Sequence, residues 1–105
     1  MAQIKWSEPA LSDLNEIAEY IAFDKISAAK KLVGNIFSTV SRLEQFPKFG
    51  RKPPEFETSQ YREIVVGPCR IFYRYENETV YILYVMRSER KLRKFIIDDR
   101  AQENC

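Results

Sequence analysis

Histidine is absent from the 105 residues of the chain. Because imidazole is the commonest general base near neutral pH, this absence excludes Ser-His-Asp and Cys-His catalytic arrangements and every zinc site that uses histidine. Any chemistry performed by this protein must therefore rely on Arg, Lys, Glu, Asp, Tyr or Cys side chains.

Other scarce features narrow the class of protein further. The number and spacing of the two cysteines, Cys69 and Cys105, fit neither a disulfide framework nor a metal site, and we expect Cys69 to be a packing residue. The three glycines form no glycine-rich phosphate loop, so no cofactor is expected. The N-terminal residues lack the apolar run of a signal peptide, and no stretch reaches the roughly 18 apolar residues of a membrane span. We therefore expect a cytoplasmic protein with no cofactor, no metal and no membrane partner.

The abundant residues favour one globular domain over 1–105. Hydrophobic residues make up 45% and aromatic residues 13% of the chain, which suits a core in so short a sequence. Apolar and β-branched runs predict strands at 4–6, 61–66, 69–75 and 79–86, and two amphipathic helices lie between the first two strands. The order β-α-α-β-β-β predicts an α+β fold. We expect a mainly antiparallel sheet, a helical hairpin packed on one face, and a basic C-terminal segment.

Further residues predict where the two helices begin and end, and what holds the loop after them. Ser7 is predicted to be the N-cap of the first helix, and Ser27 can cap the second, which stops before Pro47. Phe46 and Phe49 are expected to anchor the irregular loop that follows.

The end of the chain has a weaker helical pattern. Leu92, Phe95 and Ile96 have spacings typical of a helix within 88–98. From about residue 99 to residue 105 we expect a frayed tail.

Positive charge is concentrated after the last predicted strand. Arg87–Lys94 holds five basic residues against one acidic residue, although the net charge of the whole chain is only +2. Arg62 and Arg70 flank a Gly-Pro turn, so we expect them to lie near each other across a hairpin. Two interpretations are open. Either these arginines are solvated residues whose aliphatic stems cover the sheet, or they form a concave basic surface that binds phosphates or an acidic partner.

A series of short motifs, in order along the chain, carries a family resemblance. They are Ile4-Lys5-Trp6-Ser7, Asp13-Leu14, Tyr20-Ile21, Leu43-Glu44-Gln45-Phe46-Pro47, Phe49-Gly50-Arg51, Tyr61-Arg62-Glu63-Ile64, Arg70-Ile71-Phe72-Tyr73 and Val80-Tyr81-Ile82-Leu83-Tyr84-Val85. Over about residues 3–92 the chain resembles the RelE/ParE superfamily of toxins from type II toxin–antitoxin systems, and the ParE branch most closely. The resemblance implies a β-α-α-β-β-β fold. It also implies a cognate antitoxin, usually encoded by the neighbouring gene, that wraps a partly helical segment around the toxin.

The resemblance also bears on single residues. RelE-like members resemble ribosome-dependent mRNA endonucleases, and in them the arginine at the position of Arg70 contacts the scissile phosphate. Arg87 stands where many members have histidine, and no later tyrosine or histidine is present to assist catalysis. Arginine is a poor general base, so Glu89 is the only nearby candidate, and we expect it instead to pair with Arg90 or Arg93.

Three functions remain open at this point. ParE-like members are described as poisons of DNA gyrase that act through protein contact, and the missing histidine favours this hypothesis. The alternatives are a ribosome-dependent mRNA endonuclease, with Arg70 and Arg87 as catalytic residues, and a degenerate toxin that acts mainly as operon corepressor. The partners would be the antitoxin and either gyrase or the ribosome with mRNA, while operator DNA would be contacted only through the antitoxin complex. The residues expected to bind the target are Arg62, Arg70, Arg87, Arg90, Lys91, Arg93 and Lys94.

Overall fold

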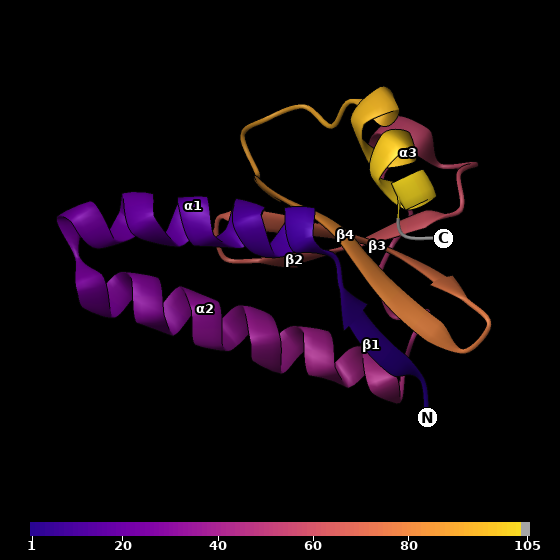
Figure 1. The fold of residues 1–105 in the computed structure, drawn as a ribbon, viewed down its shortest axis with the longest axis horizontal. Helices are drawn as coiled ribbons and strands as arrows, with labels where there is room; N and C mark the ends of the chain where they lie inside the picture. The colour runs from indigo at the N-terminus through magenta and orange to yellow at the C-terminus, as the bar shows by residue number, and fades with distance from the viewer. Residues whose placement is uncertain (104–105) are drawn as a thin grey trace.

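Four strands and three α-helices make up the computed structural model, which describes residues 1–103 (Figure 1). The elements in chain order are β1 (Gln3–Trp6), α1 (Glu8–Asp24), α2 (Ile26–Ser41), the short 3-10 helices η1 (Arg42–Glu44) and η2 (Pro54–Phe56), β2 (Tyr61–Val66), β3 (Cys69–Glu76), β4 (Thr79–Arg87) and α3 (Lys94–Glu103). The α+β class and the order of the first six predicted elements are confirmed.

The four strands form one sheet in the order β1-β4-β3-β2. β4 pairs antiparallel with β3, and β3 with β2, whereas β1 and β4 run parallel. The parallel pair arises because the two helices carry the chain from β1 to the far edge of the sheet, and two hairpins then bring it back beside β1. The sheet is therefore mainly antiparallel, as predicted, but mixed.

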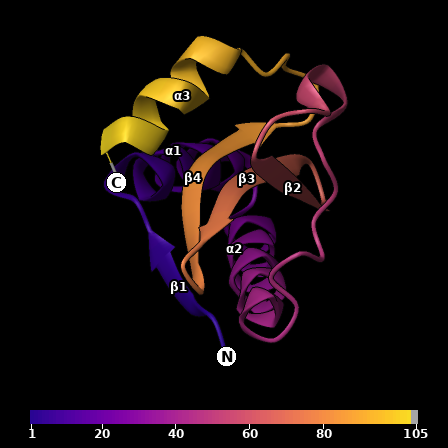
Figure 2. The ribbon, with the colours of Figure 1, turned by 90° about the vertical axis from the view of Figure 1, so that its right-hand side faces the viewer.

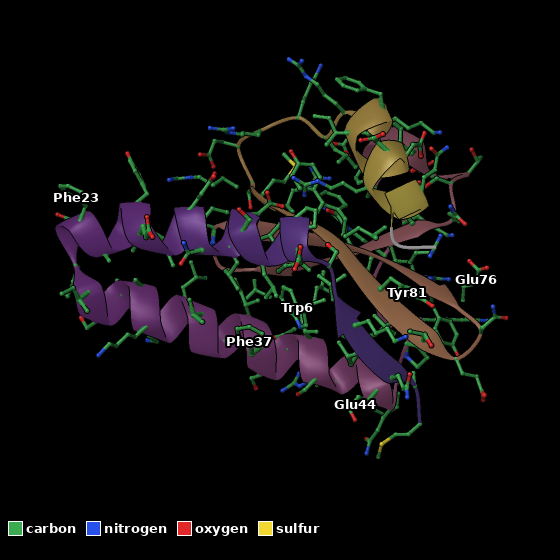
Figure 3. All side chains as sticks on the ribbon, viewed as in Figure 1. Trp6, Phe23, Phe37, Glu44, Glu76 and Tyr81 are labelled. Carbon is green, nitrogen blue, oxygen red and sulfur yellow. The ribbon has the colours of Figure 1, made fainter. Side chains whose placement is uncertain are left out.

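Helices cover both faces of this sheet (Figure 2). The predicted helical hairpin, α1 and α2, packs on one face, where fully buried side chains such as Ile36, Ile71 and Ile82 form the larger core. α3 lies over the other face and covers a smaller core that contains Phe72 and Leu83. At the open end of the hairpin, Trp6 and Phe37 face each other with ring centroids 4.9 Å apart (Figure 3). No helix within residues 1–103 combines the length and the apolar character needed to cross a membrane.

The two helices of the hairpin begin in different ways. The Ser7 hydroxyl accepts a hydrogen bond from the Ala10 amide at 3.2 Å, which confirms the predicted N-cap of α1. The Ser27 cap is wrong, because α2 already begins at Ile26 and its N-cap is Lys25, whose side chain makes no capping bond. Lys25 is extended and ends α1 as well as starting α2, so the chain reverses at one residue and Ser27 falls inside the first turn.

The loop after α2 is not anchored as expected. Phe46 and Phe49 are each 62% exposed, so neither ring is buried in a core. The buried Tyr73 fixes the loop instead, because its hydroxyl donates to the Pro47 carbonyl at 2.7 Å and accepts from the Gly50 amide at 2.9 Å.

The C-terminal segment differs from its prediction in two respects. A helix does form, but Phe95 is 68% exposed, and Leu92 with Ile97 supplies the buried contacts. The expected fraying from about residue 99 is not seen through Glu103, because α3 continues to that residue and Ala101 is buried. The last two positions of the predicted tail, including Cys105, lie outside the described residues.

Candidate functional site

The residues Arg87–Lys94, here called the basic segment, leave the sheet at the end of β4 and lead to α3. Its backbone is held at Ser88, whose amide donates to the Pro68 carbonyl at 2.8 Å, and at Leu92, whose side chain is buried. Because these two points are fixed, the charged side chains between and beyond them face solvent from a defined backbone.

Three cations of the basic segment are free to contact a partner. Arg90, Lys91 and Arg93 are exposed, and none of the carboxylates placed within residues 1–103 lies at ion-pair distance from them. Lys94 differs, since its ammonium group lies 2.8 Å from a carboxylate oxygen of Asp98 one helical turn later. The segment therefore presents three unneutralised positive charges next to one another.

Arg87 starts the basic segment and lies against α1. Its guanidinium carbon is 5.2 Å from the ring centroid of Tyr20, which is a cation–π distance. Its Nε atom is 2.8 Å from a carboxylate oxygen of Glu89. Glu89 therefore pairs with Arg87, and the predicted pairing with Arg90 or Arg93 is wrong. This contact is an ion pair without the geometry of a hydrogen bond.

A groove of about 490 Å³ runs between α1 and the end of β4 at this point. Arg87 and Arg90 line one side of it, and Asp13, Glu16 and Tyr20 from α1 line the other. Tyr20 is 68% exposed, and its ring offers an aromatic contact beside the cations. Tyr20 was not among the predicted site residues. Its position off the apolar stripe of α1 marks it as exposed, but only the tertiary structure places it beside Arg87.

Arg70 is buried in an ion-pair network, with 8% of its surface exposed. Its Nε donates to Glu63 at 2.7 Å, and its two terminal nitrogens donate to both oxygens of Glu55 at 2.9 and 2.8 Å. The guanidinium also lies 4.9 Å from the centroid of the Phe72 ring. Its hydrogen bonds lower the pKa of Glu55 to about 2, and the same bonds raise the pKa of Arg70 further above its usual range. The carboxylates of Glu55 and Glu63 thus neutralise the charge of Arg70 within the protein.

Glu63 holds this network to the sheet. Its side chain is fully buried and accepts from Arg51 at 2.9 Å as well as from Arg70. Main-chain hydrogen bonds between Glu63 and Arg51 add a bridge at the edge of β2. No distinct signal in the sequence marks this role, because Glu63 lies between Arg62 and Ile64 in a predicted strand and one of its partners lies 12 residues away in a loop.

Arg62 does not lie beside Arg70. In the hairpin Arg62 is opposite Tyr73, and Arg70 is opposite Val65. Since Val65 is an odd number of positions from Arg62, the two arginines project from opposite faces of the sheet. Arg62 instead donates to the carbonyl oxygens of Gly50 at 2.8 Å and Lys48 at 3.3 Å. The expected proximity of the two arginines is therefore wrong.

The remaining chemistry-bearing groups have packing or pairing roles. Cys69 is fully buried, and desolvation raises the pKa of its thiol, which disfavours the reactive thiolate. Asp13 accepts from the Val85 amide at 3.0 Å and from Arg100 of α3 at 3.0 Å, so it ties together three elements. Among the residues described, no group of three or more Cys, Asp or Glu side chains is placed to hold a metal ion.

A family model and several known proteins match this chain. A family model described as the ParE toxin of type II toxin–antitoxin systems, parDE, matches residues 4–92. The match includes β1 except for Gln3, all of β2 to β4 and most of the basic segment, and it ends before α3.

The proteins that resemble the chain include two relatives and two solved structures. A putative toxin, Y4kP, from Sinorhizobium fredii is 35% identical over 91 residues, which cover 85% of this chain and 91% of the relative. Toxin RelE2 from Caulobacter vibrioides is 34% identical over 68 residues, or 65% of this chain and 73% of that protein. The chromosomal ParDE toxin–antitoxin system from P. aeruginosa matches with a TM-score of 0.70 and 27% identity, covering 85% of this chain and 98% of the other. The toxin–antitoxin complex RelBE2 from Mycobacterium tuberculosis matches with a TM-score of 0.55 and 25% identity, over 82% and 96% of the two chains.

Proposed function

Because the chain belongs to the ParE family of toxins from type II toxin–antitoxin systems, we propose that it inhibits growth by binding DNA gyrase through the basic segment. In this proposal the exposed cations Arg90, Lys91 and Arg93, together with Arg87 and Tyr20 at the groove, form the surface that contacts gyrase. The protein acts by contact in the cytoplasm and cuts no nucleic acid.

The state of Arg70 carries the choice between contact and cleavage. A guanidinium that stabilises a phosphate in its transition state must reach that phosphate with its N–H donors. In this chain Arg70 directs three nitrogens at Glu55 and Glu63 and is almost wholly buried. Arg87 is a poor proton acceptor, and Glu89 forms an ion pair with Arg87. These features support a toxin that acts by binding a protein target.

The proposed neutralising partner is a cognate antitoxin. The two solved structures compared above are described as a ParDE toxin–antitoxin system and a RelBE2 toxin–antitoxin complex. We propose that operator DNA is contacted only through such a toxin–antitoxin complex.

The test compares gyrase with RNA as the target. Purified protein should inhibit supercoiling by gyrase and stabilise its cleavage complex, whereas a charge-reversed variant, R90E/K91E/R93E, should do neither. The three substituted side chains are exposed, so the variant should keep its thermal midpoint. Transcript ends mapped after induction should show no codon-phased cuts. Such cuts, with gyrase unaffected, would establish the endonuclease alternative, and growth unaffected by the toxin alone would favour the corepressor role.

A further inference from the structure

Two phenylalanine rings project from the loop Phe46–Gly50, here called the phenylalanine loop. Phe46 and Phe49 are each 62% exposed, on either side of Pro47 and Lys48. The four residues Phe46 to Phe49 line a shallow, apolar hollow at the surface. Exposed apolar side chains gathered in this way are typical of a surface that contacts a partner.

The loop is braced from inside, so the rings are presented in a fixed arrangement. Tyr73 binds both the Pro47 carbonyl and the Gly50 amide, and Arg62 donates to the carbonyls of Lys48 and Gly50. A Cβ atom at Gly50 would lie 2.7 Å from the Tyr73 side chain, which shows how closely the loop sits on the sheet. Because the loop is already ordered, binding of a partner here would cost little loop entropy.

The surroundings of the loop are positively charged. Arg62 donates to backbone carbonyls of the loop, so these hydrogen bonds leave its charge unneutralised. Lys48 is exposed between the two rings, and no carboxylate placed within residues 1–103 pairs with it. The rings thus share the loop with the cation of Lys48 and lie near that of Arg62, a pattern complementary to a ligand that carries both apolar side chains and carboxylates.

We propose that the phenylalanine loop docks an acidic segment of the cognate antitoxin that bears large apolar side chains. This inference rests on the proposed function, because it assumes that an antitoxin binds the chain. An apolar hollow suits a side chain of a peptide better than a phosphate backbone, which is why we favour a protein segment over a nucleic acid. The loop contacts Tyr73, four residues along β3 from Cys69, which pairs with Arg87. That separation is about 13 Å along the strand, so this site is distinct from the basic segment.

Binding of the antitoxin to three variants of the full chain tests the proposal. The antitoxin from the neighbouring gene is labelled with fluorescein, and its Kd is measured by anisotropy against wild type, F46S/F49S, K48E and the control F95S. Phe95 is equally exposed but lies on α3, away from the loop. We expect Kd to rise by about 100-fold for F46S/F49S, since a well-buried aromatic anchor is worth on the order of tenfold or more. K48E should weaken binding by about threefold to tenfold, and F95S should leave it within twofold.

Each other outcome has a defined meaning. Wild type that binds the antitoxin, with F46S/F49S within twofold of it, overturns the docking site but leaves the proposed function intact. Wild type that fails to bind the antitoxin overturns both the docking site and the proposed antitoxin partner, while the gyrase assay tests the rest of the proposed function separately. A labelled single-stranded oligo-dT that binds wild type and is lost from F46S/F49S, with antitoxin binding unchanged, would make the loop a nucleic-acid site and overturn the peptide assignment. Thermal midpoints of all variants are measured first, and K48E, a surface charge change, keeps the test valid if F46S/F49S is unstable.

Discussion

Replacing Arg70 by alanine should destabilise the fold, because Arg70 is the centre of a buried ion-pair network. The substitution leaves Glu63, whose side chain has no exposed surface, with Arg51 as its remaining ion-pair partner. It also removes the Arg70 hydrogen bonds to both oxygens of Glu55, one of which still accepts from the Leu92 amide at 3.4 Å. An ionised carboxylate that loses a buried partner bears its desolvation penalty without compensation.

The expected loss of stability is large for a domain of this size. Breaking a buried ion pair by removing one partner typically costs about 3–5 kcal/mol. Domains of this size are stable by about 5–15 kcal/mol, so R70A would lose a substantial fraction of that stability. With about 4 °C or more per kcal/mol for a domain near 100 residues, the thermal midpoint should fall by at least about 12 °C.

Urea denaturation followed by circular dichroism at pH 7 measures this loss. The control is R90A, which removes an exposed and unpaired arginine and should change stability by less than about 0.5 kcal/mol. In the double variant R70A/E63Q part of the stability should return, because a buried neutral amide is less costly than a buried carboxylate. A loss below about 1 kcal/mol for R70A would refute the structural role of Arg70 and reopen a role at a phosphate.

Three further predictions concern the loop, the acidic partner of Arg70, and the last helix. G50A should lose at least about 1–3 kcal/mol in urea denaturation, because a Cβ there meets a side chain at 2.7 Å and a backbone oxygen at 2.8 Å; the control G34A, with open space around it in α2, should gain about 0.5–1 kcal/mol, and equal effects would contradict this account. Since the folded pKa of Glu55 is lowered from 4.5 to about 2, its contribution to stability is present above about pH 4.5 and is lost as the pH falls toward 2. Urea midpoints should therefore fall more steeply over that range for wild type than for E55Q, and parallel curves would argue against the pairing. R100A removes the ion pair with Asp13, so the amides of α3 should exchange with deuterium several-fold faster while those of β3 stay protected; unchanged exchange in α3 would show that the pair does not hold the helix.

Local signals in the sequence account for most of the fold. The Ser7 cap and the apolar stripes determine the helical hairpin, and the alternation of Arg70 and Ile71 places Ile71 in the main core and Arg70 on the opposite face of the sheet, beside Phe72. Such features depend on neighbours within a few residues, which is why they can be read without a structure.

The parts that could not be predicted depend on distant contacts. The prediction that Phe46 and Phe49 anchor the loop is wrong because Tyr73, more than 20 residues away, binds the loop backbone and both rings stay exposed. Arg62 and Arg70 were expected to be neighbours, and the register of the hairpin places them on opposite faces.

The candidate site was predicted in part. The basic segment was apparent from its run of charges, and Arg90, Lys91 and Arg93 are exposed and unpaired within the part of the chain that the structure describes. The burial of Arg70 could not be foreseen, since Glu55 lies 15 residues away in the short 3-10 helix η2, within a stretch that shows no helical or strand periodicity in the sequence. A run of like charges is visible in a sequence, whereas the neutralisation of one arginine by a distant carboxylate is not.

We propose that this toxin inhibits growth by binding gyrase through the basic segment and not by cutting RNA with Arg70. The most direct test measures the amount of gyrase–DNA cleavage complex formed at matched concentrations of wild type and R90E/K91E/R93E. We predict that wild type accumulates the complex in a dose-dependent way and that the triple variant, with an unchanged thermal midpoint, loses the effect by at least tenfold. A wild-type protein that leaves gyrase unaffected, or a triple variant as active as wild type, would contradict the claim.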